Sequence, residues 1–126
     1  MSGTHALIIE DNQDSIEILA HLLSLQGVTY KGVNRPSKLK AADLIGVSVI
    51  FLDLDMPGMN GYEVFNLLRN VHGVDVPIIA YTVNTNEKAT TRSVGFDGMI
   101  AKPLDSSCFG DQLRRILAGE AVWDDC

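Results

Sequence analysis

The stretch that decides the fold is Phe51-Leu52-Asp53-Leu54-Asp55-Met56-Pro57-Gly58-Met59-Asn60-Gly61. Apolar residues lead up to the carboxylate of Asp53, and a turn rich in proline and glycine follows. Residues 47–52 therefore predict a buried strand that ends at Asp53. In an open parallel sheet, ligands bind outside the carboxyl ends of the strands. Asp53 is thus expected at a binding site.

Three other apolar runs also end on polar or charged residues. Residues 6–9 lead to Glu10 and Asp11, residues 77–81 lead to Thr82, and residues 98–101 lead to Lys102. If the four runs form parallel neighbouring strands, their ends meet in one cleft. Three carboxylates, a hydroxyl and an ammonium group suit a hard divalent cation and a phosphoryl group.

Segments with helical periodicity separate the strand runs. Residues 14–26, 61–72 and 106–118 each place apolar side chains on one face, with Val71 on that face of the second segment. A glycine follows each segment and fits a left-handed helix cap. A further strand is expected over residues 28–33. The order of elements then alternates strictly between strand and helix.

Two of the expected helices are weaker. Pro36 could open a short helix over residues 37–44. Residues 85–94 offer only Ala89 and Val94 as apolar anchors, and Asn84 with Glu87 resembles a capping box there. We expect this polar helix to be loosely held, as a moving element would be.

These residues resemble the receiver domain of two-component response regulators. The resemblance rests on Glu10-Asp11, on Asp53 with Met56-Pro57 and Gly61 behind it, on Thr82, and on Lys102-Pro103. It covers essentially the whole chain, in the expected order and spacing. It implies a (βα)5 domain in which Asp53 takes a phosphoryl group from a sensor histidine kinase or a histidine phosphotransfer protein. Phosphorylation would then switch the interactions of the domain with its partners.

The expected fold class is α/β and flavodoxin-like. Right-handed crossovers give a five-stranded parallel sheet with helices on both faces, and the flavodoxin-like strand order is 2-1-3-4-5. The switch point between the first and third strands would hold Glu10, Asp11 and Asp53. Residues 1–126 are expected to form a single receiver domain, with residues 120–126 as a C-terminal tail.

The resemblance also implies a role for each site residue. Asp53 is the phosphoacceptor, and Thr82 and Lys102 contact the phosphoryl group. A proline at 103 fits a cis peptide bond. The cofactor is Mg²⁺, and its ligands are Asp11 directly, Glu10 through water, Asp53, and the backbone carbonyl of Asp55, whose side chain lies toward solvent over the site.

Two residues depart from the family pattern. Met99 stands where the family usually has the aromatic residue that switches together with the threonine, here Thr82. Val83 stands where the family usually has alanine or glycine. A branched side chain there is expected to hinder water on its way to the acyl phosphate.

Two other functions remain open beside the receiver. The first is a haloacid-dehalogenase-like phosphohydrolase, which also uses an aspartate nucleophile, Mg²⁺, a threonine and a lysine. Asp55 superficially fits its acid–base residue, but Glu10-Asp11 precedes the nucleophile and no cap domain is present. The second is a degenerate receiver that acts as a scaffold. Under the receiver hypothesis, the protein is not an enzyme for an external substrate and catalyses only its own phosphorylation and dephosphorylation.

Composition narrows the class of partner. At 126 residues with a net charge of −6, the chain has no basic patch, so direct binding of nucleic acid is not expected. No apolar run is long enough to span a membrane, and the N-terminus lacks a signal-peptide pattern. We expect a cytoplasmic protein, because the kinase needs a nucleotide pool. The sequence leaves open which partner receives the signal and whether the domain forms a homodimer.

Overall fold

A computed structural model of the protein describes residues 3–56, 60–83 and 85–124. Within these residues the chain forms one parallel sheet of six strands in the order β2-β1-β3-β4-β5-β6. The strands are β1 (His5–Ile9), β2 (Thr29–Val33), β3 (Val49–Asp53), β4 (Ile78–Thr82), β5 (Gly98–Ala101) and β6 (Val122–Trp123). The first five follow the predicted order, and the α/β class is confirmed. The prediction of a five-stranded sheet is wrong by one strand, because part of the expected tail pairs with β5.

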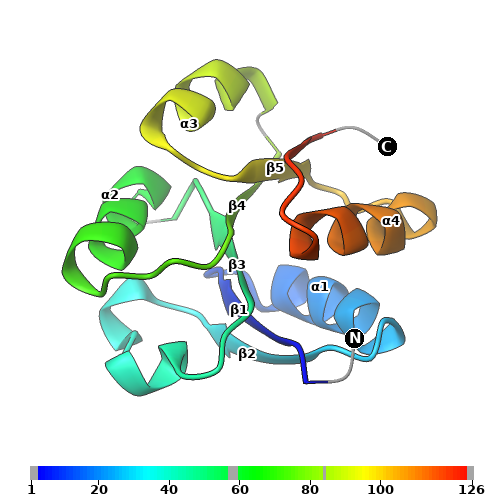
Figure 1. Cartoon of the computed structure of the whole chain (residues 1–126), viewed down its shortest axis with the longest axis horizontal. Helices are drawn as coiled ribbons and strands as arrows, with labels where there is room; N and C mark the ends of the chain where they lie inside the picture. Colours follow the sequence, from blue (N-terminus) through cyan, green and yellow to red (C-terminus); the bar gives the residue numbers. More distant parts are fainter. Residues whose placement is uncertain (1–2, 57–59, 84, 125–126) are drawn as a thin grey trace.

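Helices cover both faces of the sheet (Figure 1). One face packs its apolar side chains against α1 (Gln13–Leu25) and α4 (Ser106–Leu117). The other face lies against α2 (Gly61–Asn66), and Phe96, two residues after the end of α3 (Lys88–Val94), belongs to this second core. β1, β3 and β4 lie in the middle of the sheet, and their residues are almost entirely buried. The buried sheet therefore fixes the positions of the residues at its carboxyl edge.

Two segments differ from the helices expected of them. Residues 37–44 form two short 3₁₀ turns, η1 (Pro36–Lys38) and η2 (Ala41–Leu44), in place of one helix. After α2 the chain continues as a π-helical turn, η3 (Leu67–Val71). The wider turn rotates Val71 off the apolar face, and this side chain is 67% exposed. Its predicted inward position is wrong for that reason.

The helix α3 is held by little apolar contact. Both anchors expected from the sequence, Ala89 and Val94, are exposed, and that prediction is wrong. Thr91 is the buried residue of α3. Its hydroxyl donates to the backbone carbonyl of Glu87 at 2.6 Å and lies 3.2 Å from the hydroxyl of Tyr62 on α2. Asn84, the other half of the expected capping box, lies outside the described residues.

β6 can lie against β5 because Gly98 has no side chain. A Cβ atom at this position would collide with the backbone carbonyl of Val122. The pair Val122–Trp123 is too short to be predicted as a strand from periodicity. In the described part of the chain, no helix has both the length and the apolar character needed to cross a membrane.

Candidate functional site

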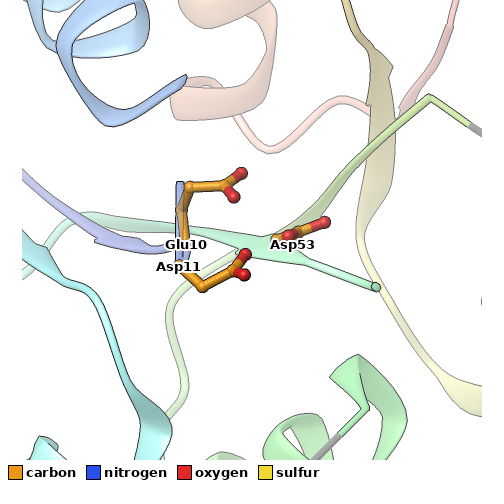
Figure 2. A group of neighbouring side chains, drawn as sticks. All are labelled: Glu10, Asp11 and Asp53. Atoms are coloured by element: carbon orange, nitrogen blue, oxygen red, sulfur yellow. The ribbon is translucent and has the colours of Figure 1, made fainter. Parts of the chain in front are cut away.

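The carboxyl ends of β1 and β3 bring three carboxylates together. Ile9 pairs with Leu52 across these strands, so Glu10 and Asp53 follow side by side. Figure 2 shows the carboxylates of Glu10, Asp11 and Asp53 around one space. One oxygen atom from each lies within 4.8 Å of the others. The acids predicted to converge from separate apolar runs do so in the structure.

Asp53 ends β3 and is buried, with 4% of its surface exposed. Its Oδ1 atom accepts a hydrogen bond from the backbone N–H of Asp55 at 3.1 Å. Gly61 packs against this bend, where a Cβ atom would lie 2.7 Å from Leu54 Cα and 2.9 Å from the Asp53 carbonyl oxygen. Glycine at 61 therefore lets α2 begin close to the site. Of the intervening loop, residues 57–59 lie outside the described residues, so the turn predicted after Asp53 stays a prediction.

Lys102 reaches the acids from the end of β5. Its Nζ forms an ion pair with Glu10 Oε2 and lies 3.6 Å from Asp53 Oδ1. It also lies 4.5 Å from the ring centroid of Tyr81. The peptide bond from Lys102 to Pro103 is cis, as expected. The resemblance implied that Lys102 contacts a phosphoryl group on Asp53, and in the structure its ammonium group lies closer to Glu10 than to Asp53.

The buried carboxyl of Glu10 has an unusual acidity. Only 1% of this residue is exposed, and burial raises its pKa to about 7. Hydrogen bonds from Lys102 and from the backbone N–H of Asn12, at 3.1 Å, oppose the rise, and the charge of Asp53 adds to it. Burial disfavours the ionised form because the carboxylate loses its water. The same environment raises the pKa of the Tyr81 hydroxyl, chiefly through burial.

Thr82 ends β4 and is fully buried. Its hydroxyl donates a hydrogen bond to Asp55 Oδ2 at 3.3 Å. The exposed side chain of Asp55 therefore lies over the site, as expected, and it also engages the threonine. The sequence did not predict this contact, because Thr82 ends β4 while Asp55 lies in the loop after β3.

The acids line a cavity of about 310 Å³ that also includes Asn12, Ser15 and Val83. Val83 is 71% exposed beside it, so its branched side chain stands at the opening. Asn12 begins α1 by accepting the backbone N–H of Ser15 at 3.0 Å, and its own N–H donates to Glu10. Asn12 and Ser15 were not predicted as site residues from the sequence. The helix-capping pattern of an asparagine before an apolar helix was the available signal.

The donor set fits Mg²⁺. This ion takes oxygen ligands, usually one or two carboxylates together with waters and substrate phosphate oxygens. Glu10, Asp11 and Asp53 offer carboxylate oxygens at a common point, and Asp11 is exposed to solvent. The residues present could therefore hold the ion while an open side remains for a phosphoryl group.

Comparison with known proteins identifies the family. A model of the response regulator receiver domain matches residues 6–114. The chain belongs to the response regulator receiver domain family. It is 30% identical over 123 residues to the sensory transduction protein RegX3 of Mycolicibacterium smegmatis, covering 97% of this chain and 54% of that protein. It is 35% identical over 106 residues to the hybrid signal transduction protein dokA of Dictyostelium discoideum, covering 79% of this chain and 6% of that protein.

A solved structure agrees with this receiver assignment. The CheY-like response regulator receiver domain of Methylobacillus flagellatus superposes with a TM-score of 0.78 at 26% identity, over 90% of this chain and 98% of that one. The receiver family therefore accounts for the chain better than a haloacid-dehalogenase-like phosphohydrolase does. The chain spans about half of RegX3 and a small part of dokA.

Proposed function

We propose that this receiver takes a phosphoryl group on Asp53 from a sensor histidine kinase or a histidine phosphotransfer protein. The observation that carries the proposal is the convergence of three carboxylates and Lys102 on one small cavity. The domain would act as a switch in the cytoplasm and turn over no external substrate. Its output partner would be a further domain or a separate protein.

One oxygen atom of the Asp53 carboxylate, Oδ1, already has contacts within the protein. Asp53 Oδ1 accepts the N–H of Asp55 and faces Lys102. We therefore assign the attack to Oδ2, which forms a bond to phosphorus while the bond from phosphorus to the histidine nitrogen breaks. The product is an acyl phosphate on Asp53 and a free histidine on the donor. Attack by water on phosphorus later restores the carboxylate and releases inorganic phosphate.

Other side chains of the site stabilise the charge that this transfer brings. Mg²⁺, held by Asp11, Glu10 and Asp53, would screen the acids from the phosphoryl oxygens. Lys102 can move its ammonium group from Glu10 toward a phosphoryl oxygen, because it already lies within 3.6 Å of Asp53. The hydroxyl of Thr82 can exchange Asp55 for a phosphoryl oxygen. These exchanges couple the chemistry to the loop after β4.

Intact-protein mass spectrometry tests the proposal. Phosphoramidate with Mg²⁺ should add one base-labile phosphoryl group to the wild-type protein and none to Asp53→Asn. Glu17→Gln, which removes an exposed carboxylate of α1, is the matched control and should label like wild type. Equal labelling of wild type and Asp53→Asn would refute the assignment. Steady release of phosphate from varied phosphomonoesters would instead support the phosphohydrolase.

A further inference from the structure

β6 closes the edge of the sheet beside the residue in the switch position. Met99 pairs with Trp123, and the backbone N–H of Asp124 donates to the carbonyl of Met99 at 2.8 Å. Met99 is fully buried, and Trp123 is partly buried against the same core (Figure 1 shows β6 beside β5). The aromatic ring at this edge of the sheet is therefore supplied by β6, while β5 carries the methionine.

Two side chains of α3 hold β6 from outside. The guanidinium carbon of Arg92 lies 4.6 Å from the ring centroid of Trp123, within the range of a cation–π contact. Lys88 Nζ lies 3.6 Å from Asp124 Oδ2. Residues 88 and 92 are four apart on a helix and thus share one face. Both contacts depend on where α3 lies.

The position of α3 is weakly fixed by the rest of the protein. The helix buries Thr91 and exposes Ala89 and Val94. Its apolar anchoring is therefore small, and its polar contacts to Tyr62 and to β6 carry much of its placement. Elements with few buried apolar contacts move at low cost in free energy.

The same helix is joined to the site by a short connection. Thr82 ends β4, the 3₁₀ turn η4 covers Thr85–Glu87, and α3 begins at Lys88. A movement of Thr82 from Asp55 toward a phosphoryl oxygen can displace η4, which begins three residues later. A shift of α3 then changes the distances from Arg92 and Lys88 to β6.

We propose that β6 is a strap over the edge of β5 that loosens when the site is filled, and that Trp123 reports this change. The inference rests on the function proposed above. Filling the site favours a position of α3 in which Arg92 no longer covers Trp123 and Lys88 no longer pairs with Asp124. Loosening of β6 exposes the backbone N–H and C=O groups along the outer edge of β5, which is a surface where another strand can pair.

The chain contains one tryptophan, so its fluorescence reports β6 alone. Beryllofluoride with Mg²⁺ serves as the phosphoryl mimic, and fluorine NMR of the bound mimic gives an independent measure of binding. On binding, the emission of Trp123 should shift to longer wavelength, since the ring loses the cover of Arg92 and meets water. Hydrogen exchange at the amide of Asp124 should accelerate, because its bond to Met99 weakens.

Variants distinguish loosening of β6 from other causes of a change in Trp123 fluorescence. Arg92→Gln should move the emission of the free protein toward that of the filled state and reduce the shift on binding. Arg114→Gln, at an exposed arginine of α4 that pairs with Asp111, is the matched control and should leave the shift unchanged. Coupling between sites is reciprocal, so Arg92→Gln should also tighten binding of the mimic, by about fivefold if typical of such coupling. Gly98→Ala, which places a Cβ atom against Val122, should act in the same direction.

The outcomes separate this inference from the proposed function. If fluorine NMR detects no bound mimic, both fail. If the mimic binds while the emission of Trp123 and the exchange of Asp124 stay unchanged, the proposed function stands and the strap is refuted. An equal response in Arg92→Gln and wild type would also refute it.

Discussion

Replacing Glu10 with glutamine should stabilise the metal-free protein at neutral and higher pH, where Glu10 would otherwise be ionised. Glu10 is almost fully buried, and its pKa is raised from 4.5 to about 7, mainly by burial. The folded protein therefore keeps a proton that the unfolded chain has released between these pH values. Because the folded state binds more protons there, the stability of wild type falls as the pH rises from 4.5 to about 7.

The size of the effect follows from the shift. Each pKa unit corresponds to about 1.4 kcal/mol, so the rise sets a ceiling of about 3 kcal/mol on the cost of ionising Glu10 in the folded protein. Glutamine avoids this cost, and the raised pKa already includes the opposing effect of Lys102. Water in the open cavity also screens the charge. We therefore expect a net stabilisation of about 1 kcal/mol above neutral pH.

Urea unfolding in EDTA measures this difference. Glu10→Gln should exceed wild type in free energy of unfolding at about pH 8 and match it at about pH 4, where Glu10 is mostly protonated in both the folded and the unfolded chain. Glu17→Gln, at an exposed acid of α1, controls for the loss of one negative charge. Added Mg²⁺ should stabilise wild type more than Glu10→Gln. A variant that is less stable than wild type at about pH 8, or equally shifted at both pH values, would refute the reasoning.

Three further substitutions test separate parts of the account. Asp11→Asn should weaken Mg²⁺ binding in calorimetric titration by about tenfold, or about 1.4 kcal/mol, since it removes the exposed ligand; unchanged affinity would contradict the ligand set. Val83→Ala should speed both phosphorylation by phosphoramidate and hydrolysis of the acyl phosphate, because Val83 stands at the opening of the cavity; two unchanged rates would exclude such a gate. Asp43→Asn should cost about 1 kcal/mol at neutral pH in urea unfolding, since Asp43 pairs with Lys31 at 2.8 Å and accepts the backbone N–H of Lys40. The ion pair to Lys31 holds the pKa of Asp43 below its usual value, so this difference should shrink in acid as Asp43 is protonated; a constant difference would contradict the pairing.

The sequence predicted the features of the site that depend on strands alone. Apolar runs that end on Glu10, Asp53, Thr82 and Lys102 fix which side chains reach the carboxyl edge, because parallel strands align their ends. These features are local in sequence, and the parallel topology then brings the strand ends together. The order of the first five strands was predicted from the flavodoxin-like topology of the receiver fold.

Features that depend on contacts between distant segments were beyond the sequence. β6 has two residues and forms because Gly98 leaves room for Val122. Lys102 lies nearer Glu10 than Asp53 and also close to the ring of Tyr81, and these side chains come from segments far apart in the sequence. The exposure of Val71 follows from a π-helical turn, which a period of 3.6 residues does not anticipate.

The most direct test of the central claim is to locate the phosphoryl group within the chain. The protein is treated with phosphoramidate and Mg²⁺, reduced with borohydride to convert an aspartyl phosphate into homoserine, and analysed by peptide mass spectrometry. The account predicts homoserine at position 53 in the presence of Mg²⁺, little without it, and none in Asp53→Asn. Homoserine at Asp11 or Asp55 in place of Asp53, or no conversion anywhere in wild type, would contradict it.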